Sequence, residues 1–341
     1  MRSYLLGEGE LLDDKGVLCE SGYAYKQVKH YDRAAVKGNK LRIKEWDYYC
    51  FGNDRFMIAL TVADNSYMSL ASVSVLDFKH IRFNTKSKIG LMPKGKLHMP
   101  SDCSHGNVLF DKGGVTIGFE IEDDGTRKLK AQYKKFYDKR DFRCEITLDP
   151  PHGDNITVVV PFRKKRQFYY NTKVNCLTGS GWFEIGDERH DLNGGHGVLD
   201  WGRGVWPFKN KWYWSSLSCE LDDGSSLGLN LGYGFGQPTA TENVIFRNGK
   251  AHKLGEVTFD IPFTQGQIDY LKPWKMSDSD GRLSIMFYPM IDRKDHMRFF
   301  RLMTDQHQVF GKFYGKVTLN DGEIVSINDK VGFAECVRNQ W

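Results

Sequence analysis

The sequence is poor in the features that mark several common classes of protein. Helical periodicity is nearly absent, and no stretch approaches the roughly 18 consecutive apolar residues that a membrane-spanning helix needs. The seven cysteines are scattered, without a C-x-x-C pair or a histidine at ligand spacing, which excludes the usual zinc motifs. We therefore predict no membrane segment and no metal or other cofactor. Dispersed cysteines of this kind are typical of reduced thiols in the cytoplasm.

The charge of the chain is also weak, at +5 for 341 residues, and does not by itself argue for nucleic-acid binding. One dense basic run, Arg163–Arg166, precedes an aromatic run, Gln167–Tyr170, as in strips that bind single-stranded nucleic acid. Charge runs are more often solvated turns, so we interpret this one as a turn into a strand and predict no nucleic-acid partner. Met1–Glu10 carries charge and no apolar core, so we predict no signal peptide and a cytoplasmic location.

What the sequence has in abundance is polar and apolar residues that alternate with a period of two. Aromatic residues make up 13% of the chain and glycine fills 35 positions, a combination typical of pleated strands joined by tight turns. Turn signals separate the alternating runs at hairpin distances, and Asn248-Gly249 is the strongest of them. The predicted strands are Arg42–Tyr49, Phe56–Val62, Tyr67–Leu76, Val115–Ile121, Leu129–Tyr133, Phe142–Leu148, Ile156–Pro161, Trp212–Leu221, Ser226–Tyr233, Val244–Lys250 (a hairpin), Phe310–Leu319 and Glu323–Ile327, and only Tyr31–Val36 hints at a short helix.

The best internal break is Pro150–Asn155, and the second half of the chain repeats the strand-and-turn pattern of the first. We therefore predict an all-β fold with two domains, residues 1–170 and 171–341, each an antiparallel β-barrel or a strongly curved sheet, packed together. A barrel of about eight strands closes its own edges and can hold one small ligand. A small, lipophilic molecule is the partner that this architecture predicts.

The chemically richest segment begins at His196 and ends at Trp214. Within it, Asp200 and Arg203 stand close to the indoles of Trp201 and Trp206. A carboxyl group held against an indole loses solvation and its pKa rises, so Asp200 is a candidate proton donor near neutral pH. Alternatively, Asp200 and Arg203 form a buried pair that fixes a strand crossing. The residues leave both interpretations open.

Aromatic residues follow at strand spacing. Trp212 and Trp214 point to one face of a strand and Tyr213 to the other, so the two indoles form either plain core or a wall that shelters a developing cation. Tyr233 lies in a glycine-rich stretch that lacks the strand–loop–helix context of a phosphate loop, and we place it among the substrate-binding residues.

Further polar candidates lie outside this segment. Glu242 and Asn243 stand between two predicted strands, where a loop can aim them into a barrel mouth or form a hydrogen-bonded turn. His307 is a candidate proton shuttle, with a structural histidine as the alternative.

Four motifs resemble a bacterial family known as domain of unknown function 2804, over almost the whole chain. They are Leu11–Ala24, Gly197–Trp206, Ala240–Asn243 and Asp305–Gly311. More distantly, Asp200-Trp201-Gly202, Trp212-Tyr213-Trp214 and Leu221-Asp222-Asp223-Gly224 are similar in order to motifs of the carotenoid 1,2-hydratase and hydroxyneurosporene synthase group. This chain departs from that group by placing Asp200 directly against Trp201. The resemblance implies two lipocalin-like barrels and cofactor-free chemistry on an apolar polyene or polyketide.

The leading hypothesis is a cofactor-independent hydratase, cyclase or isomerase that acts on a lipophilic small molecule. Asp200 would donate the proton, and Glu242 or His307 would relay protons. One alternative is a non-catalytic binding protein for a lipid or other hydrophobic ligand. Another is a carbohydrate-active enzyme, which would hold two carboxylates across an open groove. The substrate-binding residues expected are His196, Trp201, Arg203, Trp206, Trp212, Trp214, Tyr233 and Asn243.

Overall fold

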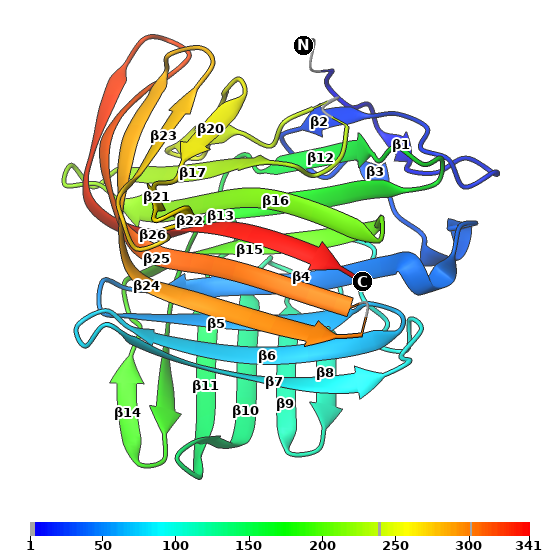
Figure 1. Ribbon diagram of the computed structural model, residues 1–341, viewed down its shortest axis with the longest axis horizontal. Helices are drawn as coiled ribbons and strands as arrows, with labels where there is room; N and C mark the ends of the chain where they lie inside the picture. The colour runs from blue at the N-terminus through cyan, green and yellow to red at the C-terminus, as the bar shows by residue number, and fades with distance from the viewer. Residues whose placement is uncertain (1–3, 238–239, 301) are drawn as a thin grey trace.

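The computed structural model describes residues 4–237, 240–300 and 302–341, and it consists almost entirely of antiparallel strands. The helical pieces of this described part are two 3-10 turns, η1 (Arg33–Ala35) and η2 (Lys40–Arg42). The short helix expected at Tyr31–Val36 is η1. Figure 1 shows two strongly curved sheets packed together. The predicted all-β class is therefore confirmed, in the form of two strongly curved sheets.

The first sheet has 13 strands. Its main path runs β7-β6-β5-β4-β15-β13-β11-β10-β9-β8, with β12 and β14 paired to β13 and β2 paired to β12. In chain order these strands are β2 (Gly22–Ala24), β4 (Ile43–Gly52), β5 (Phe56–Asp64), β6 (Met68–Asp77), β7 (Arg82–Leu91), β8 (Val108–Lys112), β9 (Val115–Ile121), β10 (Arg127–Tyr137), β11 (Arg140–Leu148), β12 (Ile156–Pro161), β13 (Phe168–Ile185), β14 (Glu188–Asp191) and β15 (Gly195–Val205).

The second sheet has nine strands in the order β19-β18-β17-β16-β26-β25-β24-β23-β20. They are β16 (Lys209–Glu220), β17 (Ser226–Tyr233), β18 (Val244–Arg247), β19 (Lys250–Lys253), β20 (Val257–Asp260), β23 (Trp274–Asp278), β24 (Leu283–Phe299), β25 (Leu302–Thr318) and β26 (Ile324–Gln340). Asn248 and Gly249 join β18 to β19 with φ angles of 48° and 77°, the backbone that the Asn-Gly hairpin signal predicts. Two small pairs complete the fold, β1 (Gly9–Glu10) with β3 (Lys29–His30) and β21 (Phe263–Thr264) with β22 (Gln267–Ile268).

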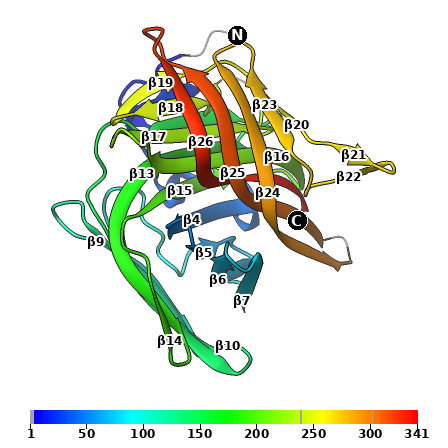
Figure 2. The same ribbon diagram turned by 90° about the vertical axis from the view of Figure 1, so that its left-hand side faces the viewer.

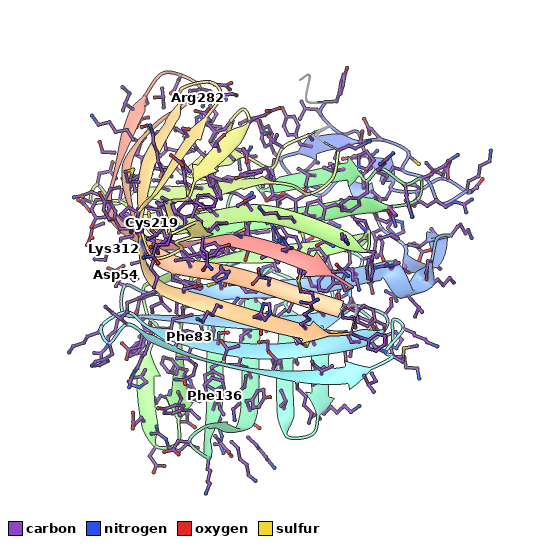
Figure 3. All side chains as sticks on the ribbon, in the orientation of Figure 1. Asp54, Phe83, Phe136, Cys219, Arg282 and Lys312 are labelled. Carbon is purple, nitrogen blue, oxygen red and sulfur yellow. The ribbon has the colours of Figure 1, made fainter. Side chains whose placement is uncertain are left out.

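Apolar side chains fill the interior of each curved sheet and also the space between the sheets. Figure 3 labels one residue of each region: Phe136 inside the first sheet, Cys219 inside the second, and Phe83 against the core between them. Figure 2, turned by 90°, shows β24, β25 and β26 crossing in front of β4 and β15. The contact between the sheets is therefore a third core, and any polar group within it is shielded from water.

The chain passes from the first sheet to the second within a few residues, because β15 ends at Val205 and β16 begins at Lys209. Pro207 stands in this link, and its missing N–H suits a place where the strand ladder ends. The segment from His196 to Trp214 therefore belongs to both sheets and lies where they meet. The predicted division after residue 170 falls inside β13, and a division into separate domains stays a prediction.

Side chains of β15 alternate between the two faces of the first sheet. Leu199, Trp201 and Val205 join the interior core of that sheet, whereas Val198 packs in the core between the sheets. Asp200 shares the face of Val198, so strand alternation directs its carboxyl group toward the second sheet.

A bulge in β13 tightens the contact between the sheets. Cys176 has a φ angle of 56°, and the pairing of β13 with β15 shifts between Val174 and Leu177. Next to the bulge, Asn175 Nδ2 donates to Leu229 O at 3.1 Å and to Ser216 Oγ at 2.9 Å, both in the second sheet. The irregularity thus joins the two sheets by direct hydrogen bonds.

Candidate functional site

Asp200 lies at the contact between the sheets, where its side chain forms an ion pair. Lys173 Nζ is 2.7 Å from Asp200 Oδ1, and Asn171 Nδ2 donates to the same oxygen at 2.6 Å. The register of β13 and β15 places Lys173 directly opposite Asp200, so strand pairing itself makes the ion pair. Lys173 Nζ also lies 4.0 Å from the centroid of the Trp214 ring on β16, so both sheets meet at this lysine.

The neighbours of Asp200 on β15 point to the other face. Arg203 pairs with Asp47 at 3.0 Å, and its guanidinium lies 4.2 Å over the Trp201 ring, inside the first sheet. The expected burial of the Asp200 carboxyl against Trp201 is therefore wrong, and so is the alternative pair with Arg203. The reason is the alternation of strand side chains, which separates residues one or three apart onto opposite faces.

Glu242 comes from the segment between β17 and β18 and is 2% exposed. The Tyr169 hydroxyl donates to its Oε2 at 3.2 Å, while Oε1 has no hydrogen-bond partner among the described residues. Burial raises the pKa of this carboxyl; the charge of Lys173 opposes the rise and the charge of Asp200 adds to it. Loss of solvation on burial favours the neutral form of a carboxyl group.

A third carboxyl group, Glu335 on β26, completes the group and was not predicted from the sequence. Trp212 Nε1 donates to its Oε1 at 2.8 Å, and Gln308 Nε2 donates to its Oε2 at 3.0 Å. Burial raises the pKa of Glu335 to about 7, against the opposing effects of the Trp212 hydrogen bond and the Lys173 charge. We call Asp200, Glu242, Glu335 and Lys173 the intersheet carboxylate cluster.

Replacement of Glu335 by glutamine is expected to flatten the pH dependence of stability. Because the pKa is about 7 in the folded protein and ordinarily 4.5, the folded state keeps a proton that the unfolded chain releases between these values. Stability therefore falls as pH rises through this window, by about 3 kcal/mol for Glu335 alone. Urea unfolding of wild type and Glu335→Gln at about pH 5 and pH 8 measures the difference. The exposed Glu256→Gln variant is the control, and an unchanged pH dependence in Glu335→Gln would contradict the prediction.

Aromatic rings enclose the cluster. Tyr169 stacks on Phe235 at 4.9 Å, and Trp206 lies 5.4 Å from Trp212 and 5.8 Å from Trp46, all between ring centroids. We call this set, together with Trp214, the aromatic wall. The structure thus brings Trp206, Trp212 and Trp214 together at the cluster.

The remaining predicted residues lie elsewhere. His307 faces the interior of the second sheet, where its ring stacks on Tyr270 at 3.8 Å and its Nδ1 is 2.8 Å from Asp292 Oδ2. Its neighbour Gln308, on the opposite face of β25, is the residue that reaches the cluster. Tyr233 also faces that interior, stacked on Tyr213 at 4.5 Å.

Asn243 and His196 are not part of the cluster either. Asn243 Oδ1 accepts from Gly232 N at 2.7 Å, and its Nδ2 donates to Gly255 O at 2.9 Å, so its side chain closes a turn. His196 lies four residues before Asp200 on the same strand, about 13 Å away at the usual rise per residue. Burial lowers the pKa of its imidazole.

An open cleft of about 700 Å³ lies next to the aromatic wall. It is formed where the β12–β13 turn, the β15–β16 link and the approach to β4 meet. The starts of β4 and β16 lie toward the right-hand side of Figure 1. Phe162, in its lining, has its ring 5.3 Å from that of Trp206. The lining is Asn39, Arg42, Phe162, Arg163, Lys164, Gln167, Pro207, Phe208, Lys209, Gly236 and Gln237.

The described residues include no group of three or more histidine, cysteine, aspartate or glutamate side chains placed to hold a metal ion. Within the same ranges, no helix has the length and apolar character to cross a membrane.

The sequence motifs contained Asp200, Glu242 and the tryptophans, but Lys173 and Glu335 stand in ordinary strands without any motif. The signal available for Lys173 was a single charged residue inside an otherwise uncharged strand segment, Phe168–Ser180. For Glu335, the comparable signal was an acidic residue flanked by apolar ones in Val331–Val337. A charge in a buried strand needs a partner, so both were candidates for a buried ionic group.

Comparison with known proteins extends these observations. A solved structure of a protein from Nitrosomonas europaea described as AttH aligns with a TM-score of 0.56 and 16% identity, covering 90% of this chain and 95% of that one. Kievitone hydratase from Nectria haematococca aligns at 0.48 with 12% identity, over 87% and 88% of the two chains. CghA in complex with Sch210972 aligns at 0.43 with 10% identity, over 98% and 97%. The first alignment shows a shared fold.

No curated protein matches the chain in sequence. The model of one protein family, the domain of unknown function DUF2804, matches residues 4–341. That span includes both sheets, the intersheet carboxylate cluster and all four motifs on which the sequence resemblance rests. The chain is therefore a member of the DUF2804 family.

Proposed function

We propose that the protein is an enzyme of the hydratase, cyclase or isomerase kind, which carries out acid–base chemistry on a lipophilic small molecule between the two sheets. The observation that carries the proposal is Glu242: a buried carboxyl group with a raised pKa and one oxygen that accepts no hydrogen bond from a described residue. A neutral acid with a free oxygen, in an apolar and aromatic setting, is what protonation of an alkene or carbonyl requires.

Asp200 has a different task from Glu242 in this proposal. Asp200, which accepts hydrogen bonds from Lys173 and Asn171, is the base in this proposal. Glu242 transfers its proton to a substrate carbon, and the resulting cation loses a proton to Asp200, either from a neighbouring carbon or from an added water. The first route isomerises or cyclises the substrate and the second hydrates it.

The aromatic wall supports the same chemistry. Trp214 already lies 4.0 Å from the Lys173 ammonium, which shows that its face accommodates positive charge. A carbocation at this place would receive the same stabilisation and would be shielded from bulk water by Trp206, Trp212 and Phe235.

The carbohydrate alternative fits the site less well. It expects two carboxylates across an open groove, whereas Asp200, Glu242 and Glu335 are 8%, 2% and 5% exposed. The alternative that the experiment has to distinguish is a binding protein without catalytic activity. Such a protein needs the aromatic wall but no titratable carboxyl group.

The test is deuterium transfer in D₂O. The purified protein is incubated in D₂O with a fraction of apolar metabolites, and products are identified by mass spectrometry. We expect a product that carries deuterium on carbon, with the mass of added D₂O for a hydratase or of a singly deuterated isomer otherwise. The Glu242→Gln protein should not form it. Ligands that bind unchanged in both proteins, without any deuterated product, would show a binding protein instead.

Substitution of Gly232 by alanine tests the placement of the acid without changing its chemistry. A Cβ on Gly232 would lie 2.7 Å from Glu242 Oε1 and 2.8 Å from Phe235 Cε2, so the carboxyl group has to move. We expect deuterium transfer to fall at least tenfold, the order seen when a reacting group shifts by about 1 Å. In the control Gly118→Ala, the added Cβ meets Leu109 at an ordinary 3.7 Å, and its activity should not change. Full activity in Gly232→Ala would place the acid elsewhere.

A further inference from the structure

We propose that the cleft next to the aromatic wall binds the oxyanion head of an amphipathic small molecule, a carboxylate or phosphate joined to an apolar chain. The inference that the apolar chain reaches the catalytic carboxyl group rests on the proposed function. The inference also deepens that function, because it names the class of substrate. The head group in the cleft would anchor the molecule while its chain extends toward the intersheet carboxylate cluster.

The first support is charge. Arg42, Arg163, Lys164 and Lys209 line the cleft, and the described residues of its lining include no aspartate or glutamate. Arg163, Lys164 and Lys209 have no aspartate or glutamate side chain of the described residues within salt-bridge distance. Arg42 donates to the Trp341 backbone oxygen and lies over the Phe208 ring. Uncompensated cations around a concave surface favour an anionic ligand, and guanidinium groups match the geometry of carboxylate and phosphate.

A second cleft continues this positive surface. It has a volume of about 470 Å³, shares Lys209 with the first, and adds Lys211 and Arg338, again without an acidic residue in its lining. Arg163 and Lys164, from the basic run that the sequence indicated as a solvated turn, therefore form one side of an extended cationic region. A head group with more than one negative charge fits this region better than a neutral one.

The second support is the apolar inner side of the cleft. Phe162, Pro207 and Phe208 stand among the cations, so the cleft combines charge with apolar surface. The Phe162 ring lies 5.3 Å from the Trp206 ring, and the Trp206 ring lies 5.4 Å from the Trp212 ring, between centroids. Trp212 in turn donates a hydrogen bond to Glu335. A molecule held by its head at Lys164 and Arg163 would place its chain against Phe162, where this largely buried line of rings begins.

Isothermal titration calorimetry with dodecyl phosphate, dodecanoate, dodecanol and inorganic phosphate, each below its micelle concentration, tests the inference. We expect the two amphipathic anions to bind at least tenfold more tightly than dodecanol or inorganic phosphate. Dodecanol lacks the anionic head group, and inorganic phosphate lacks the apolar chain. Binding of the anions should weaken as salt is raised. The relative affinities of dodecyl phosphate and dodecanoate identify which head group the cleft prefers.

Variants locate the site. Arg163→Gln/Lys164→Gln changes two exposed cations of the cleft and should weaken dodecyl phosphate binding roughly tenfold. The matched control Lys130→Gln/Lys134→Gln removes the same charge from exposed positions on β10 and should bind as wild type does. Wild-type protein that binds the amphipathic anions but forms no deuterated product in D₂O would count against the proposed function alone, whereas product formation without such binding would count against this inference alone.

Several results would overturn the inference. They are equal binding of dodecanol and dodecyl phosphate, inorganic phosphate bound as tightly as dodecyl phosphate, unchanged affinity in Arg163→Gln/Lys164→Gln, and binding to anionic lipid vesicles without any uptake of the dissolved amphiphiles. The last would show a membrane-contact surface in place of a ligand cleft.

Discussion

Substitution of Asp200 by alanine is expected to destabilise the protein by about 3–5 kcal/mol, because it leaves the Lys173 ammonium buried without its counter-ion. The Lys173 side chain is only 2% exposed and cannot extend to water without disturbing the Trp214 ring beneath it. Equilibrium unfolding in urea gives the free-energy change, with a lower midpoint and an unchanged slope expected if both proteins unfold in one step. A change below about 1 kcal/mol, which is typical of a surface ion pair, would show that burial does not increase the effect of this pair on stability.

Two further variants separate the ion pair from its surroundings. Asp222→Ala breaks the pair with Lys330, in which the aspartate is 91% exposed, and should have a much smaller effect. Asp200→Asn/Lys173→Met removes both charges and leaves an apolar side chain against Trp214, so it should recover most of the stability lost in Asp200→Ala. If the double variant instead loses as much stability as Asp200→Asn and Lys173→Met lose when added together, the two groups act independently.

Replacement of Glu242 by glutamine is expected to lower the rate of deuterium transfer by about 10²- to 10⁴-fold, the contribution typical of a positioned general acid. The amide has nearly the shape of the protonated acid but cannot give up a proton. Because burial already disfavours the charged form of Glu242, its replacement by a neutral group should leave stability unchanged or raise it. The combination of lost activity with retained stability distinguishes a catalytic carboxyl group from a structural one.

The measurement follows the deuterated product over time in wild type and Glu242→Gln, together with thermal unfolding of both. Glu256→Gln, on an exposed position, is the matched control and should keep the wild-type rate. A Glu242→Gln protein that turns over at the wild-type rate would exclude Glu242 as the acid and leave Glu335, with its pKa of about 7, as the next candidate.

Much of the fold could be predicted from the sequence because it depends on local signals. Period-2 alternation and turn residues act over a few positions, and the strands that they predict, such as Phe56–Val62 and Val115–Ile121, are present as β5 and β9. Strand lengths were predicted less well. β25 begins at Leu302, ahead of the expected start at Phe310, because its polar first half is stabilised by pairing with β24 and β26 rather than by its own pattern.

The candidate site could be predicted only in part because it is assembled by strand register. Alternation alone separates Asp200 from Trp201, but the partner of Asp200 follows from the pairing of β13 with β15. Glu335 is brought in by β26, and neither its distance from Trp212 nor its burial has a local signal. Side chains that meet across a contact between sheets are fixed by tertiary packing, which one sequence does not encode in a readable pattern.

Residues that contact one another in this fold are far apart in the sequence, and this affects how the chain folds during synthesis. Trp212 and Glu335 are 123 residues apart in sequence, and the contact between Asp47 and Arg203 spans 156. Contacts between such distant residues need large loops to close first, so folding of this protein should be slow compared with that of a protein of hairpins alone. During synthesis, β16 emerges well before its partner β26 and carries Trp212 and Trp214 on an unpaired edge. Until β26 arrives, that edge is open to other nascent chains, and we expect aggregation at high expression to begin there.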